Sequence, residues 1–103
     1  MIKVSVMYPA KPGAHFDMSY YCAKHIPLVR QLLGPALLNV SVDEGIASLT
    51  PGAPAPFFVL CHLSFESVPK FQEAFASHAA QIVGDIPNYT NSEPTVQISN
   101  VKI

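Results

Sequence analysis

The sequence of 103 residues is poor in charged residues and has no tryptophan. Lysine and arginine total 6, aspartate and glutamate total 7, and these residues are scattered singly, so that the net charge is −1. So little positive charge gives no basic field to hold phosphates, which argues against a nucleic-acid partner. No window reaches the roughly 18 apolar residues that span a bilayer, and residues 1–8 are too few and too alternating for a signal peptide. We therefore expect a cytoplasmic protein that does not bind a membrane.

Cysteine is also scarce, since only Cys22 and Cys61 are present. In a reducing compartment two cysteines are expected to remain thiols, and cysteine packs as a small hydrophobic residue. We therefore predict two free, buried, structural thiols.

Apolar residues, in contrast, make up half of the chain, and the mean hydropathy is +0.29. This value is high for a small soluble monomer. Exposed apolar patches usually mark contacts between proteins, so the composition predicts a homodimer.

Hydrophobic periodicity and capping residues predict the order β-α-β-β-α-β, with the first helical region divided into two segments. Ile2, Val4, Val6 and Tyr8 alternate with polar residues or methionine, as in a strand with two distinct faces. Asp17 is a good helix N-cap, and Pro27 should interrupt the helix that it begins. The remaining predicted segments are a short helix over 27–33, strands over 36–46, 57–66 and 95–103, a loop over 48–56, and a helix from Ser67 to about Val83.

This order predicts an α+β fold of the ferredoxin-like type, in one domain over residues 1–103. Four antiparallel strands should form the sheet, and right-handed crossovers should place the helices on one of its faces. We expect the apolar alternates of the strands to line the other face, so that two sheets meet back to back in a dimer.

Several segments resemble the EthD family, whose members are small dimeric α/β-barrel domains named after a protein of ethyl tert-butyl ether degradation. The similar segments are "YYCAKHIPL", the following "GP", "SVPKFQEAF" and "DIPNYTNSEPTVQIS". The most specific signal is the pairing of a histidine-x-proline-leucine element at 25–28 with an aspartate-x-proline-asparagine element at 85–88. The resemblance implies a dimer and a link to oxidative catabolism. The wider superfamily holds cofactor-free monooxygenases, haem-degrading monooxygenases, chlorite dismutases, muconolactone isomerases and polyketide cyclases, so the fold alone defines no reaction.

Tyr21 and His25 are the predicted catalytic residues. Four positions apart, they share one face of a helix, which should point at the sheet. A phenol and an imidazole together can orient a carbonyl or phenol-like substrate and move a proton near neutral pH. The alternative is structural: His25 could bond carbonyl groups that Pro27 frees, while Tyr21 packs in the core.

Five further residues are candidates for substrate binding: Tyr20, Asn39, His62, His78 and Tyr89. His78 lies on the apolar stripe of the second predicted helix, where similar haem-degrading enzymes place an iron ligand, but those enzymes also use a tryptophan that is absent here. The four histidines are separated by 10, 37 and 16 residues, which match no local metal motif. Phosphate-cradling, GxSxG and dinucleotide motifs are absent. We expect no metal and no cofactor.

The sequence thus predicts an EthD-like catabolic enzyme with an apolar pocket between sheet and helices. Its chemistry is either cofactor-independent oxidation, as in an oxidoreductase, or proton transfer, as in a cyclase or isomerase. A small apolar, aromatic or carbonyl substrate suits such a pocket. The alternative is a non-catalytic homodimer that binds an apolar ligand or assists another protein.

Overall fold

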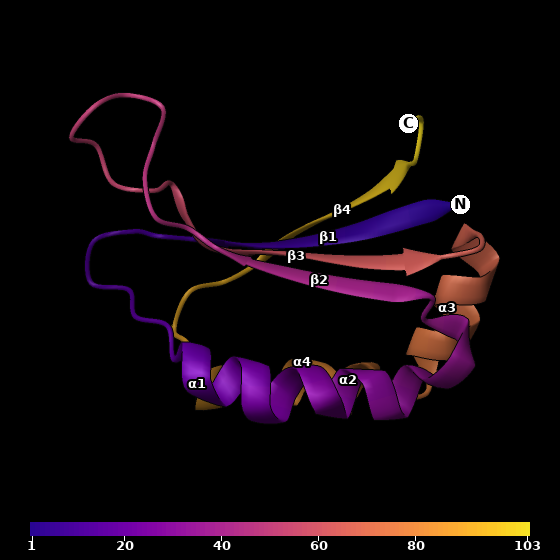
Figure 1. Cartoon of the computed structure of the whole chain (residues 1–103). Helices are drawn as coiled ribbons and strands as arrows, with labels where there is room; N and C mark the ends of the chain where they lie inside the picture. The colour runs from indigo at the N-terminus through magenta and orange to yellow at the C-terminus, as the bar shows by residue number, and fades with distance from the viewer.

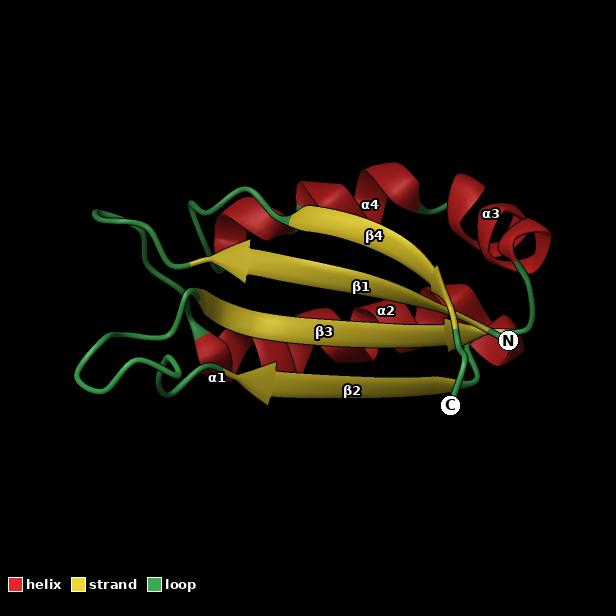
Figure 2. Cartoon of the chain, turned by 90° about the horizontal axis from the view of Figure 1, so that it is seen from above, coloured by secondary structure: helices red, strands yellow, loops and turns green.

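A four-stranded antiparallel sheet backed by helices makes up the computed structural model, which describes residues 1–103. The strands are β1 (Ile2–Pro9), β2 (Asn39–Glu44), β3 (Phe57–Phe65) and β4 (Thr95–Asn100). Their order across the sheet is β2-β3-β1-β4, and each neighbouring pair is antiparallel (Figure 2). The predicted ferredoxin-like fold is confirmed, with β1 and β3 at the centre of the sheet.

All helices lie on one face of the sheet (Figure 1). In chain order they are α1 (Met18–Tyr20), the π-helical turn η1 (Tyr21–His25), α2 (Ile26–Leu33), the 3-10 turn η2 (Gly34–Ala36), α3 (Val68–Ala76), α4 (Ala79–Gly84) and the 3-10 turn η3 (Ile86–Asn88). Asp17 begins the first of them as predicted, because its Oδ1 accepts a hydrogen bond from the backbone N–H of Tyr20 at 3.0 Å.

Pro27 does not end the first helix, which corrects the predicted break. The chain passes from α1 through η1 into α2 without leaving helical backbone, and the N–H of Ile26 donates to the carbonyl of Tyr21 five residues earlier. A proline ring collides with the carbonyl four residues before it, here that of Ala23. Ala23 lies inside the wider π turn, so the helix accommodates Pro27 by a local change of pitch.

The second long helix is divided in two, although the sequence predicted one helix to about Val83. Ser67 begins α3 as predicted, because its Oγ accepts a hydrogen bond from the N–H of Lys70. His78 leaves the α-helical region with φ −122° and ψ 0°, and α4 follows it. This break gives α4 a direction of its own, and Ile82 is the residue that α4 buries.

The sheet face away from the helices is polar, which corrects the prediction of an apolar face. Strand pairing places Ser41, His62, Ser5 and Gln97 in one row across the sheet. The flanking rows on this face contain Asn39, Ser64, Lys3 and Ser99 on one side and Asp43, Leu60, Met7 and Thr95 on the other. An antiparallel sheet with one uncovered face typically carries polar residues there. The strongly apolar β3 concealed this pattern, because its neighbours supply most of the polar side chains.

The core lies between the sheet and the helices, and it is rich in aromatic residues. Tyr8, Tyr21, Phe65 and Tyr89 are among its largest fully buried side chains. Cys61 is buried in this core as predicted, whereas Cys22 is exposed, and both are free thiols. No helix is long and apolar enough to cross a bilayer.

Candidate active site

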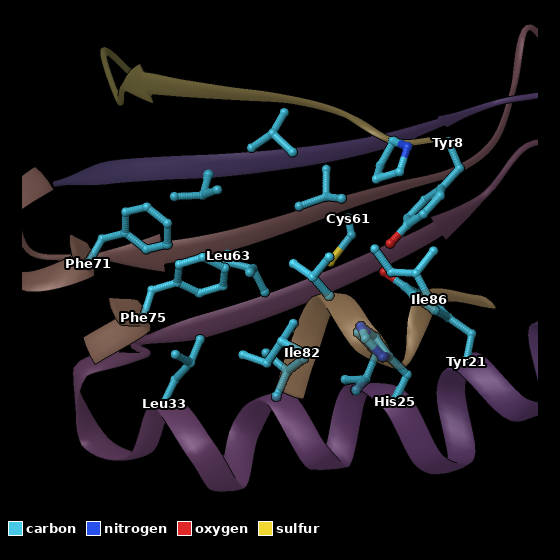
Figure 3. Close-up of a pocket in the computed structure, with 17 residues that line it drawn as sticks. Tyr8, Tyr21, His25, Leu33, Cys61, Leu63, Phe71, Phe75, Ile82 and Ile86 are labelled. Atoms are coloured by element: carbon cyan, nitrogen blue, oxygen red, sulfur yellow. The ribbon is translucent and has the colours of Figure 1, made fainter. Parts of the chain in front are cut away.

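An apolar cavity of about 310 Å³ lies between the sheet and the helices. Of its 17 lining residues only His25 and Pro94 are not hydrophobic. The labelled side chains in Figure 3 are arranged by character: Leu33, Phe71 and Phe75 lie toward one end, and Tyr8, Tyr21 and His25 lie toward the other. Because Val83 and Val96 line the cavity and are more than half exposed, the cavity opens between α4 and β4. The cavity therefore has an apolar end, a polar end and a mouth of its own.

The alternation of the strands explains which residues reach the cavity. Val4 and Val6 of β1 pair with Leu63 and Cys61 of β3, and all four side chains line the cavity. Tyr8 follows on the same face, near the end of β1. A period of two therefore places a hydroxyl group after two valines, at the polar end of the cavity.

His25 is almost fully buried, with 4% of its surface exposed, yet both of its ring nitrogens have partners. Nδ1 lies 2.8 Å from Oδ2 of Asp85, and Nε2 lies 3.3 Å from the hydroxyl oxygen of Tyr89. The ring also stacks on Tyr21, with centroids 5.4 Å apart and planes 15° apart. The π turn permits this stacking, because residues 21 and 25 are separated by nearly one turn of a π-helix.

The Asp85 carboxylate fixes the tautomer of His25. Oδ1 of Asp85 accepts hydrogen bonds from the Tyr20 hydroxyl at 2.7 Å and from Nδ2 of Asn88 at 2.9 Å. Burial raises the pKa of Asp85, but the hydrogen bonds from Asn88, Tyr20 and His25 outweigh burial and hold this pKa below its ordinary value. An ionised carboxylate only accepts hydrogen bonds, so Nδ1 of His25 carries a hydrogen and donates it to Asp85.

Burial lowers the pKa of His25, although Asp85 acts in the opposite direction. The imidazole is therefore neutral at pH 7. With the hydrogen on Nδ1, the lone pair of Nε2 is free to accept the hydroxyl hydrogen of Tyr89. The buried ring can therefore act as a base, and the Asp85 carboxylate would stabilise the imidazolium that protonation forms.

Tyr8 extends this network into the cavity. The hydroxyl oxygens of Tyr8 and Tyr89 are 2.7 Å apart in the protein interior. Burial raises the pKa of Tyr8 to about 12, and burial likewise raises the pKa of Tyr89. Tyr8, Tyr89, His25 and Asp85 consequently form one continuous chain of hydrogen bonds.

Tyr21 lines the cavity beside this chain. Its ring is 1% exposed, and burial followed by the nearby Cys61 raises the pKa of its hydroxyl. Tyr21 therefore stays neutral and can act only as a hydrogen-bonding or packing group.

The structure brings together four of the seven residues that the sequence selected as candidates. One network of hydrogen bonds and stacked rings contains His25, Tyr21, Tyr20 and Tyr89. Within it, the ring of Tyr20 stacks on that of Tyr89, with centroids 6.2 Å apart. The aspartate of this network, Asp85, was missed as a site residue, although it opens the 85–88 element. Tyr8 was missed because its sequence context is that of an ordinary strand residue, and its hydrogen-bond partner, Tyr89, is 81 positions away in the same chain.

The other three candidates lie elsewhere. His62 is on the polar face of the sheet, where its Nδ1 and Oγ of Ser5 are hydrogen-bonded at 2.7 Å. His78 lines a separate surface groove with Lys70. Asn39 is exposed at the start of the edge strand β2.

Acidic, cysteine and histidine side chains do not gather in a group of three or more that could hold a metal ion. The polar groups of the site are neutral oxygen and nitrogen groups and the single carboxylate of Asp85.

Comparisons with known proteins agree with this architecture. The sequence pattern of the EthD domain matches residues 14–93. An uncharacterised 11.0 kDa protein from the thcB-thcC intergenic region of Rhodococcus erythropolis is 33% identical over 99 residues, which cover 93% of this chain and 90% of that protein.

Solved structures extend the likeness to three dimensions. An EthD-like protein from Ralstonia eutropha JMP134 is 44% identical, with a TM-score of 0.95 over 99% of this chain and 92% of that one. An ethyl tert-butyl ether degradation family protein from Bacillus halodurans has a TM-score of 0.70 at 18% identity, and the match covers 99% of each chain. A proposed monooxygenase from Shewanella loihica shares the fold, with a TM-score of 0.56 at 17% identity over 100% of this chain and 98% of that one.

Proposed function

The chain belongs to the EthD family, and from this premise we propose that it is an enzyme of small-molecule catabolism, whose reaction begins when a proton passes from an uncharged substrate to His25. One observation carries the proposal: a buried imidazole, hydrogen-bonded to Asp85, lies at the polar end of an otherwise apolar cavity. A core that needed only packing would favour an apolar side chain there, because burying a polar ring requires partners for both nitrogens.

The lining of the cavity defines the substrate class. No lysine, arginine or carboxylate faces it, so a charged ligand would lose its hydration without gaining a counter-ion. An uncharged ketone or phenol turns its oxygen-bearing end toward Tyr8 and Tyr21 and its ring toward Leu33, Phe71 and Phe75.

Two reactions can follow the removal of this proton. In an isomerisation or cyclisation the substrate anion rearranges and takes a proton back, so that no oxidant is needed. In an oxygenation the electron-rich anion gives electrons to O₂, the oxidant, and its carbon forms a bond to oxygen; with one proton this gives a hydroperoxide, which loses water and leaves a carbonyl group on the substrate. The Shewanella loihica protein, named as a proposed monooxygenase, motivates the second route, although it shares only the fold with this chain.

Hydrogen exchange on a ketone tests the first step without knowledge of the natural substrate. We propose 2-tetralone in D₂O, with the exchange of its C1 hydrogens followed by NMR and its binding followed by calorimetry. The wild-type protein should accelerate exchange above the buffer rate. His25→Gln should remove the acceleration while leaving the melting temperature and the binding nearly unchanged.

The alternative, a non-catalytic ligand-binding or accessory protein, predicts a different result in this experiment. Binding of 2-tetralone without any exchange would support a ligand-binding or accessory protein. Exchange that survives in His25→Gln would contradict the role proposed for the imidazole.

We also propose that the protein is a homodimer joined on the polar side of the sheet. The loop at 45–56 and the C-terminal residues rise on this side, away from the helices (Figure 1). Ile46 and Leu49 in the loop and Ile103 at the C-terminus are almost fully exposed and would be covered by a second copy. Light scattering should give twice the chain mass of 11.1 kDa, and a monomer mass would contradict the dimer.

A further inference from the structure

We propose that Tyr8 is a catalytic residue and that protons reach His25 only through Tyr8 and Tyr89. In this arrangement Tyr8 touches the substrate, Tyr89 relays the proton, and His25 stores it. The inference rests on the proposed function and adds the route by which the proton travels.

This route is needed because both ring nitrogens of His25 already have hydrogen-bond partners. Nδ1 of His25 is bonded to Asp85, and Nε2 faces the hydroxyl of Tyr89. A substrate in the cavity therefore finds neither nitrogen free. Tyr89 is 1% exposed and does not line the cavity, whereas Tyr8 lines it and bonds to Tyr89 at 2.7 Å. The substrate consequently meets the network at Tyr8.

The direction of every hydrogen bond follows from the carboxylate. Asp85 accepts from Nδ1, so the lone pair on Nε2 of the neutral ring must accept from Tyr89. The hydroxyl hydrogen of Tyr89 is thereby used, and its oxygen accepts the hydrogen of Tyr8. All the donors of the chain point toward Asp85, so the oxygen of Tyr8 can only accept a hydrogen, either from the neighbouring Tyr21 hydroxyl or from a substrate that displaces it in the cavity.

Transfer along this chain balances without any added group. The C–H or O–H bond of the substrate breaks and its proton binds to the oxygen of Tyr8. The former hydrogen of Tyr8 passes to Tyr89, and that of Tyr89 passes to Nε2. The products are a substrate anion, two neutral tyrosines, and an imidazolium beside the Asp85 carboxylate. The reverse sequence returns a proton to the rearranged substrate, and in D₂O it returns a deuteron once the Tyr8 hydroxyl has exchanged with solvent through the mouth of the cavity.

The two tyrosines suit a concerted relay. Burial raises the pKa of both hydroxyls, so neither persists as a tyrosinate. After the transfer, Tyr8 holds the proton that came from the substrate and donates a hydrogen bond to the new anion. The relay therefore also supplies a donor where negative charge develops.

Exchange of 2-tetralone in Tyr8→Phe and Tyr89→Phe tests the relay, with Ser92→Ala as the matched control. Ser92 is also a buried hydroxyl, and its hydrogen bond goes to the carbonyl of Pro9 outside the chain of donors. Each tyrosine variant should lower the exchange rate about 100-fold, within the usual range for proton-transfer groups, while calorimetry finds 2-tetralone bound within a few-fold of wild type. Ser92→Ala should keep the wild-type rate.

The pH profile separates a relay from a packing role. Wild-type exchange should fall at acid pH as His25 becomes protonated, and the residual exchange in Tyr8→Phe should no longer follow this titration. If Tyr8→Phe proves unstable, 3-fluorotyrosine at position 8 keeps the ring and the hydroxyl but makes the hydroxyl more acidic. A changed exchange rate at an unchanged melting temperature would support the relay, and an unchanged rate would contradict it.

Three results would decide against the inference. If wild-type protein exchanges 2-tetralone and Tyr8→Phe does so at the same rate, the relay is overturned and the proposed function stands. An unchanged rate in Tyr89→Phe equally overturns the relay. Absence of exchange in the wild type overturns the proposed function, and the relay with it.

Discussion

His25 and Asp85 are 60 positions apart in the sequence, yet Nδ1 and Oδ2 lie 2.8 Å apart. The contact joins the π turn of the first helical stretch to the turn that follows α4. It sets the tautomer of a buried imidazole and supplies the nearest negative charge. Most of the chemistry that we expect from this protein depends on this pair.

Asp85→Asn should weaken the base and shift its titration. The carboxylate opposes the effect of burial on the pKa of His25, so its loss should move the acid limb of exchange to lower pH. We also expect the exchange rate at neutral pH, where His25 is unprotonated, to fall by at least about 10-fold, because the imidazolium loses its counter-ion. Asp17→Asn is the matched control, since asparagine caps helices as well as aspartate does. Equal effects of the two variants would show that Asp85 has no special role.

The free energy of unfolding should decrease in acid in two stages. The pKa of His25 in the folded protein is below its ordinary value of 6.5, so below about that pH the unfolded chain binds a proton that the folded chain does not. Stability should therefore be constant above that pH and fall below it. The pKa of Asp85 is lowered from 3.8, which predicts a second loss in stronger acid.

Urea unfolding at a series of pH values measures this dependence. His25→Gln should flatten the first stage and leave the second. A wild-type stability that rises as pH falls below about 6 would contradict the lowered pKa of His25.

A large side chain at the mouth should close the cavity without unfolding the protein. Val83 and Val96 are 53% and 56% exposed, so Val96→Trp has space to place its indole over the opening. Calorimetry should detect at least about a 10-fold loss of 2-tetralone binding, which corresponds to 1.4 kcal/mol. Val101→Trp, on an exposed residue that does not line the cavity, is the control. Equal binding in both variants would place the entrance elsewhere.

The two thiols should react at very different rates. Cys22 is exposed, whereas Cys61 is buried beside the cavity and burial raises its pKa. A disulfide reagent such as DTNB should modify one thiol quickly and the other only slowly, because the thiolate is the reactive form. Cys22→Ser should remove the fast phase. Bound 2-tetralone should slow the second phase, and a slow phase insensitive to the ligand would mean that Cys61 is reached by another path.

Local signals in the sequence were sufficient for most of the fold. The alternation over Ile2–Pro9, the caps Asp17 and Ser67, and the apolar run of β3 depend on neighbours within a few residues, and the structure confirms each of them. The polar sheet face was missed because it emerges only when four strands are set in register. Pairing of Ser5 with His62 is not visible in either strand alone.

The candidate site divides in the same way. Tyr21 and His25 are neighbours on one helical stretch, so their spacing alone predicted that they would share a face. Tyr8 and Asp85 joined them through contacts across 81 and 60 positions. Hydrophobic periodicity does not predict such contacts, because they depend on the position and orientation in which the helices pack against the sheet. A motif with unusual residues, as at 85–88, was the one signal that could have selected Asp85.

The π turn at Tyr21–His25 also has a consequence for how the sequence can change over time. Removing one residue from this turn would restore the regular α-helical repeat, with each N–H bonded four residues back. The same deletion would rotate everything before it by about 100° relative to α2, carrying Tyr21 out of line with the imidazole. In a relative, the number of residues between the helix cap at Asp17 and Pro27 would therefore show whether the π turn, and with it the stacking of Tyr21 on His25, is kept.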